Sequence, residues 1–212
     1  MERLLVPELL DSLDPADPDA VRSRRDLRAI DVFMGNSRWI FRGLRQAGFT
    51  GGKLAELGAG EGRLAARIAE AFPGANVTGL DLVPRPQGLP QRVGWESGDF
   101  FQTLDAVRPE VVIASLVLHH FSDEALRELG RWIRQARVVV FSEPWRDPVP
   151  LRLSALAMPF VGQVTRHDMP ASIRAGFREG ELPHLLGLNV GQWRVVESCR
   201  WQGALRVLGW RP

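Results

Sequence analysis

The stretch KLAELGAGEG, residues 53–62, places three glycines between a short apolar strand and the start of a helix pattern. Glycine lets the backbone turn tightly and approach a ligand, while the first turn of a helix presents free N–H groups to an anion. Glu56 precedes the glycines and supplies a carboxylate, which would repel a phosphate but attract an ammonium group. The stretch therefore predicts a ligand that carries both a carboxylate and an amine.

The neighbouring residues disfavour two kinds of phosphate-binding turn. A dinucleotide-binding turn, G-x-G-x-x-G/A, needs a small residue at its sixth position, where this chain has Arg63. A P-loop needs a lysine after the glycines, but the sole lysine, Lys53, comes before them. Asp81 closes the next strand-like run, GLDL, at a separation along the chain from which a carboxylate can reach a ribose.

The run E-L-G-A-G-E-G followed by Asp81 resembles the class I S-adenosylmethionine-dependent methyltransferases, and the later segment SLVLHHF is similar to their small-molecule, quinone-biosynthesis-like branch. The resemblance implies an enzyme with S-adenosyl-L-methionine as cofactor, its methionine part at the glycine turn and its ribose at Asp81. The cofactor-binding residues that it implies are Glu56, Gly58, Ala59, Gly60, Gly62, Asp81, Leu82, Asp99, Phe100, Ser115 and Leu116.

Two further segments carry the resemblance. In SGDFF it implies that Asp99 contacts the adenine amino group and that Phe100 lies against the adenine ring. The alternative is that Asp99 only caps the helix that follows. In SLVLHHF the resemblance implies that His119 or His120 faces the transferred methyl group, and the alternative is a packed or solvated histidine.

Histidine is the side chain that could deprotonate a hydroxyl acceptor near neutral pH. The chain has four histidines and no tyrosine, and His167, His119 and His120 are the catalytic candidates. His167 lies in VTRHDMP, inside a long insertion that is expected to cover the top of the sheet. The alternative there is that Asp168 forms the N-cap of a helix and that His167 merely precedes it.

The elements that must position these residues alternate between helical and strand-like runs. Amphipathic helices are predicted at residues 19–34 and 36–47, and short apolar runs then alternate with helices, which is typical of a parallel sheet. Three prolines in VPRPQGLPQR exclude a regular helix after the second strand. The runs QWRVVESCRW and ALRVLGW predict a closing antiparallel pair. With the resemblance, the predicted fold class is α/β: a Rossmann-like class I methyltransferase fold with a seven-stranded, mostly parallel sheet, an antiparallel C-terminal hairpin and an N-terminal helical cap.

The length of 212 residues fits a single methyltransferase domain. We divide it into an N-terminal helical cap at 18–48, a cofactor-binding core at 49–145, an insertion over the acceptor site at 146–191 and a C-terminal hairpin at 192–212. One cysteine provides no disulfide and no usual Cys/His zinc cluster, and we expect no metal. Without a run of eighteen apolar residues or a signal-peptide pattern, a cytoplasmic protein with no membrane span is expected.

The expected reaction is methyl transfer to a small apolar or aromatic acceptor, with O-methylation of a phenolic or polyketide-like hydroxyl favoured. Trp39, Glu143 and Trp145 are the candidate substrate-binding residues. A net charge of only +2, and the absence of an Asn/Asp-Pro-Pro-aromatic run after the fourth strand, argue against a nucleic-acid partner. The alternatives are C-methylation of a similar acceptor, an RNA or protein methyltransferase, and a non-catalytic cofactor-binding protein.

Overall fold

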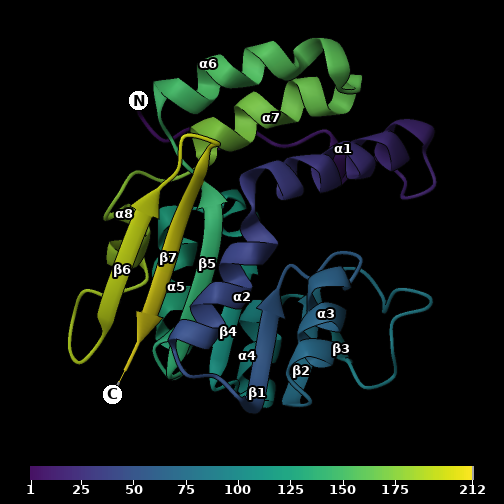
Figure 1. Ribbon diagram of the computed structural model, residues 1–212. Coiled ribbons are helices and arrows are strands. Elements are labelled where there is room, and N and C mark those ends of the chain that lie inside the picture. Colours follow the sequence, from purple (N-terminus) through teal and green to yellow (C-terminus); the bar gives the residue numbers. More distant parts are fainter. Residues whose placement is uncertain (212) are drawn as a thin grey trace.

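The computed structural model describes residues 1–211 and is built around one seven-stranded sheet (Figure 1). The strands are β1 Gly51–Leu57, β2 Gly74–Asp81, β3 Gly94–Ser97, β4 Val111–Ser115, β5 Val138–Pro144, β6 Arg194–Cys199 and β7 Ala204–Trp210. Their order is β3-β2-β1-β4-β5-β7-β6, and β7 pairs antiparallel with both β5 and β6. The mostly parallel sheet with an antiparallel terminal hairpin confirms the predicted fold class.

Helices cover both faces of the sheet and its upper edge. They are α1 Pro18–Met34, α2 Asn36–Gln46, α3 Arg63–Ala71, α4 Phe100–Val107, α5 Asp123–Ile133, α6 Pro148–Ala157, α7 Gln163–Ala175 and α8 Glu181–Leu185, with 3-10 turns η1 Leu10–Ser12, η2 Leu118–His120 and η3 Met158–Phe160. In Figure 1, α1, α6 and α7 lie above the carboxyl ends of the strands. Among residues 1–211, no helix has the length and apolar character that a membrane crossing requires.

Two apolar clusters, one on each face of the sheet, hold the layers together. Strands buried on both faces are expected to be largely apolar, and VVIA in β4 and VVVF in β5 show this pattern. One cluster joins α2 and α3 to the sheet, and the other joins α4, α5 and α8 to the opposite face. Each fully buried leucine or isoleucine contributes about 1.5–3 kcal/mol of transfer free energy, so these clusters fix the strand ends that carry the site.

Local signals in the sequence set several helix ends. Ser122 is the N-cap of α5, and its side chain accepts from the Ala125 N–H. Asp99 caps α4 by accepting from the Phe101 N–H at 2.9 Å, which confirms the capping interpretation. Between α1 and α2, Gly35 adopts φ +68°, a conformation that lets a single residue join the two helices.

The proline-rich connection between β2 and β3 is irregular, as predicted. The Arg85 guanidinium holds it by donating to the carbonyls of Val93, at 2.6 Å, and Pro90, at 2.9 Å. The side chain of Leu89, from the same connection, packs over Gly62 in the glycine turn. The loop thereby forms a wall beside that turn without any helix.

One predicted helix boundary is wrong. Asp168 is not the N-cap of a helix, because α7 begins five residues earlier, at Gln163, and continues through Pro170. The Asp168 carboxylate instead accepts from the backbone N–H groups of Leu9 and Leu10, at 2.8 and 3.0 Å. The group that the sequence assigned to a local cap therefore attaches a distant segment to α7.

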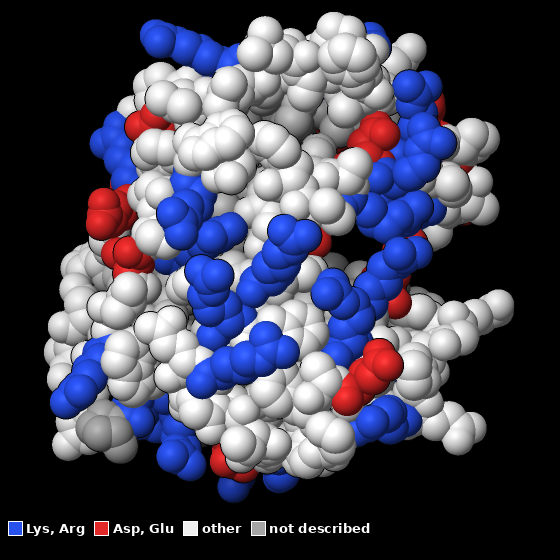
Figure 2. All heavy atoms as spheres, viewed as in Figure 1, with Lys and Arg blue, Asp and Glu red and all other residues white. Residues whose placement is uncertain are grey.

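Arginine side chains gather on the face that Figure 2 shows. Arg38, Arg42 and Arg45 are exposed on α2, a helix that carries no acidic residue. The pocket described below is lined by other elements and includes none of these arginines.

Candidate active site

The glycine turn after β1 has the backbone conformation of a ligand cradle. Gly58, Gly60 and Gly62 have φ values of +62°, +54° and +70°, which side chains rarely adopt. A Cβ at Gly58 would lie 2.4 Å from the Val117 Cγ2, so only glycine fits there, whereas a Cβ at Gly60 would meet nothing within 4 Å. A side chain is therefore excluded at Gly58, whereas the space beside Gly60 is open.

Glu56, at the end of β1, is a buried carboxylate that lacks a partner. The residue is 5% exposed, and its Oε2 has no hydrogen-bond partner within the described structure. Burial raises the pKa of Glu56 to about 8; the Ala65 N–H opposes this, and the charge of Asp81 adds to it. A cation placed against Glu56 would relieve this cost, as the predicted ammonium ligand would.

Asp81 and the glycine turn meet at the carboxyl edge. The Asp81 Oδ2 accepts from the Gly60 N–H at 2.6 Å, and its Oδ1 accepts from the Val83 N–H at 3.2 Å. Leu82 beside it is 78% exposed and leaves this side of the turn accessible. The predicted ribose-binding carboxylate thus lies directly next to the predicted methionine-binding turn.

The structure argues against the adenine contact predicted for Phe100. Phe100 is 6% exposed, belongs to the core under α4 and stacks on Phe101 with ring centroids 5.2 Å apart. Its ring is therefore used in packing. Asp99 is exposed at the same strand edge while capping α4, and its contact with adenine stays a prediction.

The turn after β4 joins the glycine turn to the histidines. Leu116 adopts φ +57°, a costly conformation for a leucine, and its N–H donates to the Ser142 carbonyl at 2.9 Å. Ser115, which precedes it, is half-buried at the end of β4. Val117 packs against Gly58, so the cofactor cradle lies two residues from His119 along this turn.

A buried His–Glu pair forms the centre of the site. Glu143, at 0% exposure on β5, accepts from the N–H groups of Val117, Leu118 and His119 at 3.0–3.3 Å. Its Oε2 also lies 2.9 Å from the His119 Nδ1. With Nδ1 bound to the carboxylate, the imidazole is fixed and its Nε2 faces the other way.

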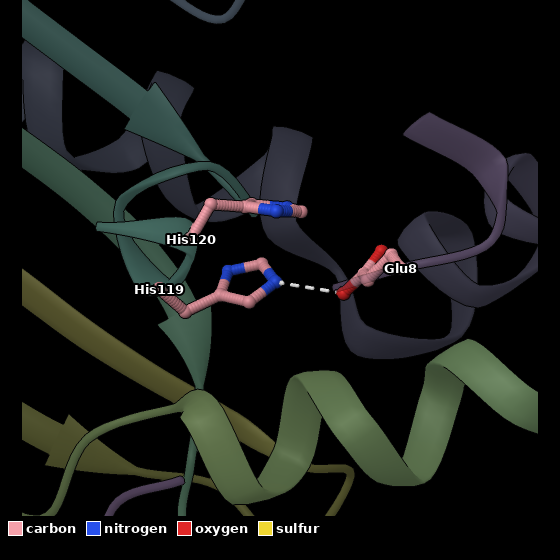
Figure 3. A group of neighbouring side chains, drawn as sticks. All are labelled: Glu8, His119 and His120. Atoms are coloured by element: carbon pink, nitrogen blue, oxygen red, sulfur yellow. Dashed lines mark ion pairs between the residues drawn. The ribbon is translucent and has the colours of Figure 1, made fainter. Parts of the chain in front are cut away.

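Figure 3 shows what the Nε2 atom of His119 faces. The Glu8 Oε1 lies 3.5 Å from it, and the His120 Nδ1 lies 3.5 Å from the Asp11 Oδ2. Burial lowers the pKa of His119, but Glu143 and Glu8 outweigh it and raise the pKa to about 9. Burial raises the pKa of Glu8, and its interactions with the two histidines outweigh this and lower it.

The donor atoms of Glu8, His119 and His120 lie within 4.8 Å of one another. Donor atoms at this spacing could hold a metal ion. His119 forms an ion pair with Glu8 and a bond with Glu143, and His120 forms an ion pair with Asp11. We therefore assign the group to ion pairing.

A pocket of about 270 Å³ adjoins this cluster. Its lining combines apolar side chains with the two histidines and two carboxylates: Leu5, Val6, Pro7, Glu8, Asp11, His119, His120 and Ala175. Glu8 and the other pocket residues from residues 1–12 could not be predicted, because this segment carries no periodic pattern and reaches the site only through contacts distant in the chain.

Three predicted site residues lie apart from this pocket. His167 is on α7 with a side chain 45% exposed, and its Nδ1 lies 2.9 Å from the Asp168 Oδ1, which argues against a role as general base. Trp39 is buried in the core, with its indole N–H donating to the Phe141 carbonyl at 3.0 Å. Trp145 packs against the core on the other face, so neither tryptophan lines the pocket.

Comparison with known proteins gives a match to one protein domain and a shared fold. Residues 41–139 match the family model of the O-methyltransferase domain. Acetylserotonin O-methyltransferase 3 of Oryza sativa subsp. japonica is 30% identical over 111 residues, or 51% of this chain, and trans-resveratrol di-O-methyltransferase of Vitis vinifera is 28% identical over 107 residues, or 50% of this chain. The chain spans only 28% of the length of each of these relatives.

Among solved structures, the plantazolicin methyltransferase BpumL, in complex with a triazolic desmethylPZN analogue and SAH, superposes with a TM-score of 0.71. The match covers 92% of both chains at 11% identity, so it shows a shared fold. Together with the O-methyltransferase match, it confirms the resemblance drawn from the glycine turn and Asp81. The chain therefore has the fold of the class I S-adenosylmethionine-dependent methyltransferases, and its residues 41–139 match the O-methyltransferase domain.

Proposed function

We propose that this chain catalyses the S-adenosylmethionine-dependent O-methylation of a small apolar or aromatic molecule that carries a hydroxyl group. One observation carries the proposal: the glycine cradle and the buried His119–Glu143 pair meet at the same sheet edge, joined through Val117. The O-methyltransferase domain match over residues 41–139, and the small-molecule O-methyltransferases that resemble this chain, support the class of acceptor.

The residues at the glycine turn fit the cofactor. The unpartnered Oε2 of Glu56 suits an ammonium group, the space beside Gly60 is open to a ligand, and Asp81 can accept from ribose hydroxyls. When bound, S-adenosylmethionine supplies an electrophilic methyl group on a sulfonium. We assign the methionine part to Glu56 and the glycine turn, and the ribose to Asp81.

The chain's own residues then orient the acceptor and move one proton. Where an acceptor hydroxyl would meet that methyl group, the Nε2 of His119 would take the hydroxyl proton, and Glu143 would stabilise the imidazolium that forms. The buried turn and the pocket exclude water and hold the oxygen in line. Because a base must be neutral and the pKa of His119 is about 9, kcat/KM is expected to rise with pH up to about 9.

The direct test combines cofactor binding with turnover. S-adenosylhomocysteine at a hundredfold excess over Kd is expected to stabilise the protein by about 2.7 kcal/mol in thermal unfolding. Incubation with S-adenosylmethionine and a panel of phenols and polyketide-like acids is expected to yield products one methyl heavier by mass spectrometry. Binding without any methylated product across the panel would favour the non-catalytic alternative, and the absence of binding would refute the cofactor assignment.

Cofactor binding is expected to release about one proton per protein molecule at pH 7, because Glu56 is neutral in the free protein and ionised against an ammonium group. Calorimetric titration of S-adenosylhomocysteine in phosphate and in Tris measures this release as the dependence of the binding enthalpy on the buffer. In Glu56→Gln, which has the same shape but no titrating proton, the dependence should disappear and affinity should fall. An unchanged buffer dependence in that variant would show that the proton comes from elsewhere.

A further inference from the structure

Residues 1–12, which we call the strap, cross the top of the site and are attached at both ends. At one end the Arg3 guanidinium donates to the carbonyls of Ala175 and Phe121, both at 2.8 Å, and pairs with Asp123 at 2.7 Å. At the other end, the N–H groups of Leu9 and Leu10 bond to Asp168 on α7. The strap is therefore held by contacts on either side of the pocket.

The middle of the strap is loosely packed by comparison. Leu5 and Val6 are 41% and 38% exposed although they line the pocket, so lifting this part would expose little additional apolar surface. Only Glu8 points from it into the protein, with a side chain 12% exposed that bonds to the Ser172 hydroxyl and faces His119. The strap thus has two fixed ends and a middle part that a ligand can displace.

The contact between Glu8 and His119 is an ion pair that is long for a hydrogen bond. The distance of 3.5 Å between the Oε1 and the Nε2 exceeds the 2.7–3.2 Å that N–H donors usually keep. The Nε2 is buried and has no hydrogen-bond partner within the described structure. A buried nitrogen without a hydrogen-bond partner is stabilised when a closer partner, such as a hydroxyl oxygen, forms a hydrogen bond with it.

The charged groups around His119 come from four segments. Glu143 faces it from β5, Glu8 and Asp11 face it from the strap, and His120 adjoins it in η2. Arg3 donates to its carbonyl oxygen at 3.2 Å, which places a positive charge on the backbone side of the ring. On α7, the carboxylate of Asp168 is bonded to the strap and to His167. Of these groups, only Glu8 faces the nitrogen that would act on an acceptor.

We propose that Glu8 is a positioning residue that covers the Nε2 of His119 while no acceptor is bound, and that the acceptor hydroxyl takes its place beneath the strap. This inference rests on the proposed function, because it takes His119 as the base. Displacement of Glu8 removes one of the two carboxylates that keep the imidazole protonated, so the Nε2 proton passes to solvent and the ring is a neutral base where the acceptor binds. Binding of the acceptor and activation of its base are thereby one event.

The test compares Glu8→Gln with Glu2→Gln, a matched amide substitution on the same strap at an exposed side chain that does not line the pocket. In Glu8→Gln the acidic limb of the kcat/KM profile is expected to move to lower pH, with kcat/KM at pH 7 rising roughly tenfold. NMR titration of the His119 imidazole should show the same downward movement of its pKa. Glu2→Gln should leave both the profile and the His119 titration unchanged.

Two results would overturn the proposal: an unchanged pH profile in Glu8→Gln, or a fall in kcat without movement of the profile, which would mean that Glu8 supports the imidazolium during turnover. Glu8→Asp should restore the original profile if the carboxylate is what matters. The NMR titration requires no turnover, so it tests the contact between Glu8 and His119 independently of catalysis. If the His119 titration moves in Glu8→Gln while His119→Ala retains full activity, the proposed base is wrong but the contact with Glu8 is confirmed.

Discussion

Replacing His119 by alanine is expected to lower kcat by about 10²- to 10⁴-fold, the usual contribution of a positioned general base. The variant loses the His119 imidazole, whose Nδ1 is bonded to Glu143 and whose Nε2 is directed at the pocket. Cofactor binding should persist, because the glycine turn, Glu56 and Asp81 do not contact the ring. Initial rates at saturating acceptor, with the product measured by mass spectrometry, give the effect.

His167→Ala is the matched control for that measurement. His167 is exposed on α7 and bonds to Asp168, so its removal should change kcat less than twofold and leave the pH profile as it is. The reverse result, with His167→Ala impaired and His119→Ala active, would move the base to α7. A calorimetric titration of S-adenosylhomocysteine into both variants shows whether either has lost the folded cofactor site.

Replacing Glu143 by alanine is expected to cost about 3–5 kcal/mol in the free energy of unfolding, or to prevent folding altogether. The carboxylate accepts from the N–H groups of Val117, Leu118 and His119, and it pairs with a buried imidazole. Its loss leaves all of these donors in the core without an acceptor. Urea unfolding monitored by tryptophan fluorescence measures the difference, and Glu143→Gln, which keeps an acceptor oxygen, should lose less.

The loss in the free energy of unfolding caused by Glu143→Ala should also depend on pH. The pKa of His119 is raised from 6.5 to about 9 in the folded protein, so the stability that its charged form contributes is complete below pH 6.5 and is lost as pH rises through 9. The stability difference between wild type and Glu143→Ala should therefore shrink between pH 6.5 and pH 10 without reaching zero, since the backbone donors do not titrate. A difference that stays constant over this range would mean that His119 is not charged in the folded protein.

The sequence predicted the fold well where local patterns determine it. The strands, their parallel order and the helix caps at Asp99 and Ser122 follow from apolar runs and capping residues that act over a few positions. The glycine turn was also readable, because positive φ values require glycine and because Glu56 and Asp81 adjoin it at strand ends. These features depend on neighbouring residues, so one sequence is enough to identify them.

The acceptor side was less predictable for a physical reason. Glu8 reaches His119 across more than a hundred residues, and the strap that carries it has no periodicity to mark it. Asp168 and His167 resembled a helix start because an acidic residue followed closely by proline is a common one, but α7 tolerates Pro170 inside the helix. Trp39 was equally misleading, since an aromatic residue in a cap helix can line a pocket or pack against a strand.

The bond between Asp81 and Gly60 has an energetic consequence for affinity. Both oxygens of this carboxylate already accept backbone N–H groups, so its rotamer is chosen before any ribose arrives. Ordering a free side chain on binding costs about 0.5–1.5 kcal/mol, and here that conformational entropy has been lost during folding instead. Since each carboxylate oxygen can accept a second hydrogen bond, ribose hydroxyls can add to the existing bonds without breaking them. The protein thus meets its cofactor with a rigid acceptor, and part of the binding affinity is provided by the stability of the fold.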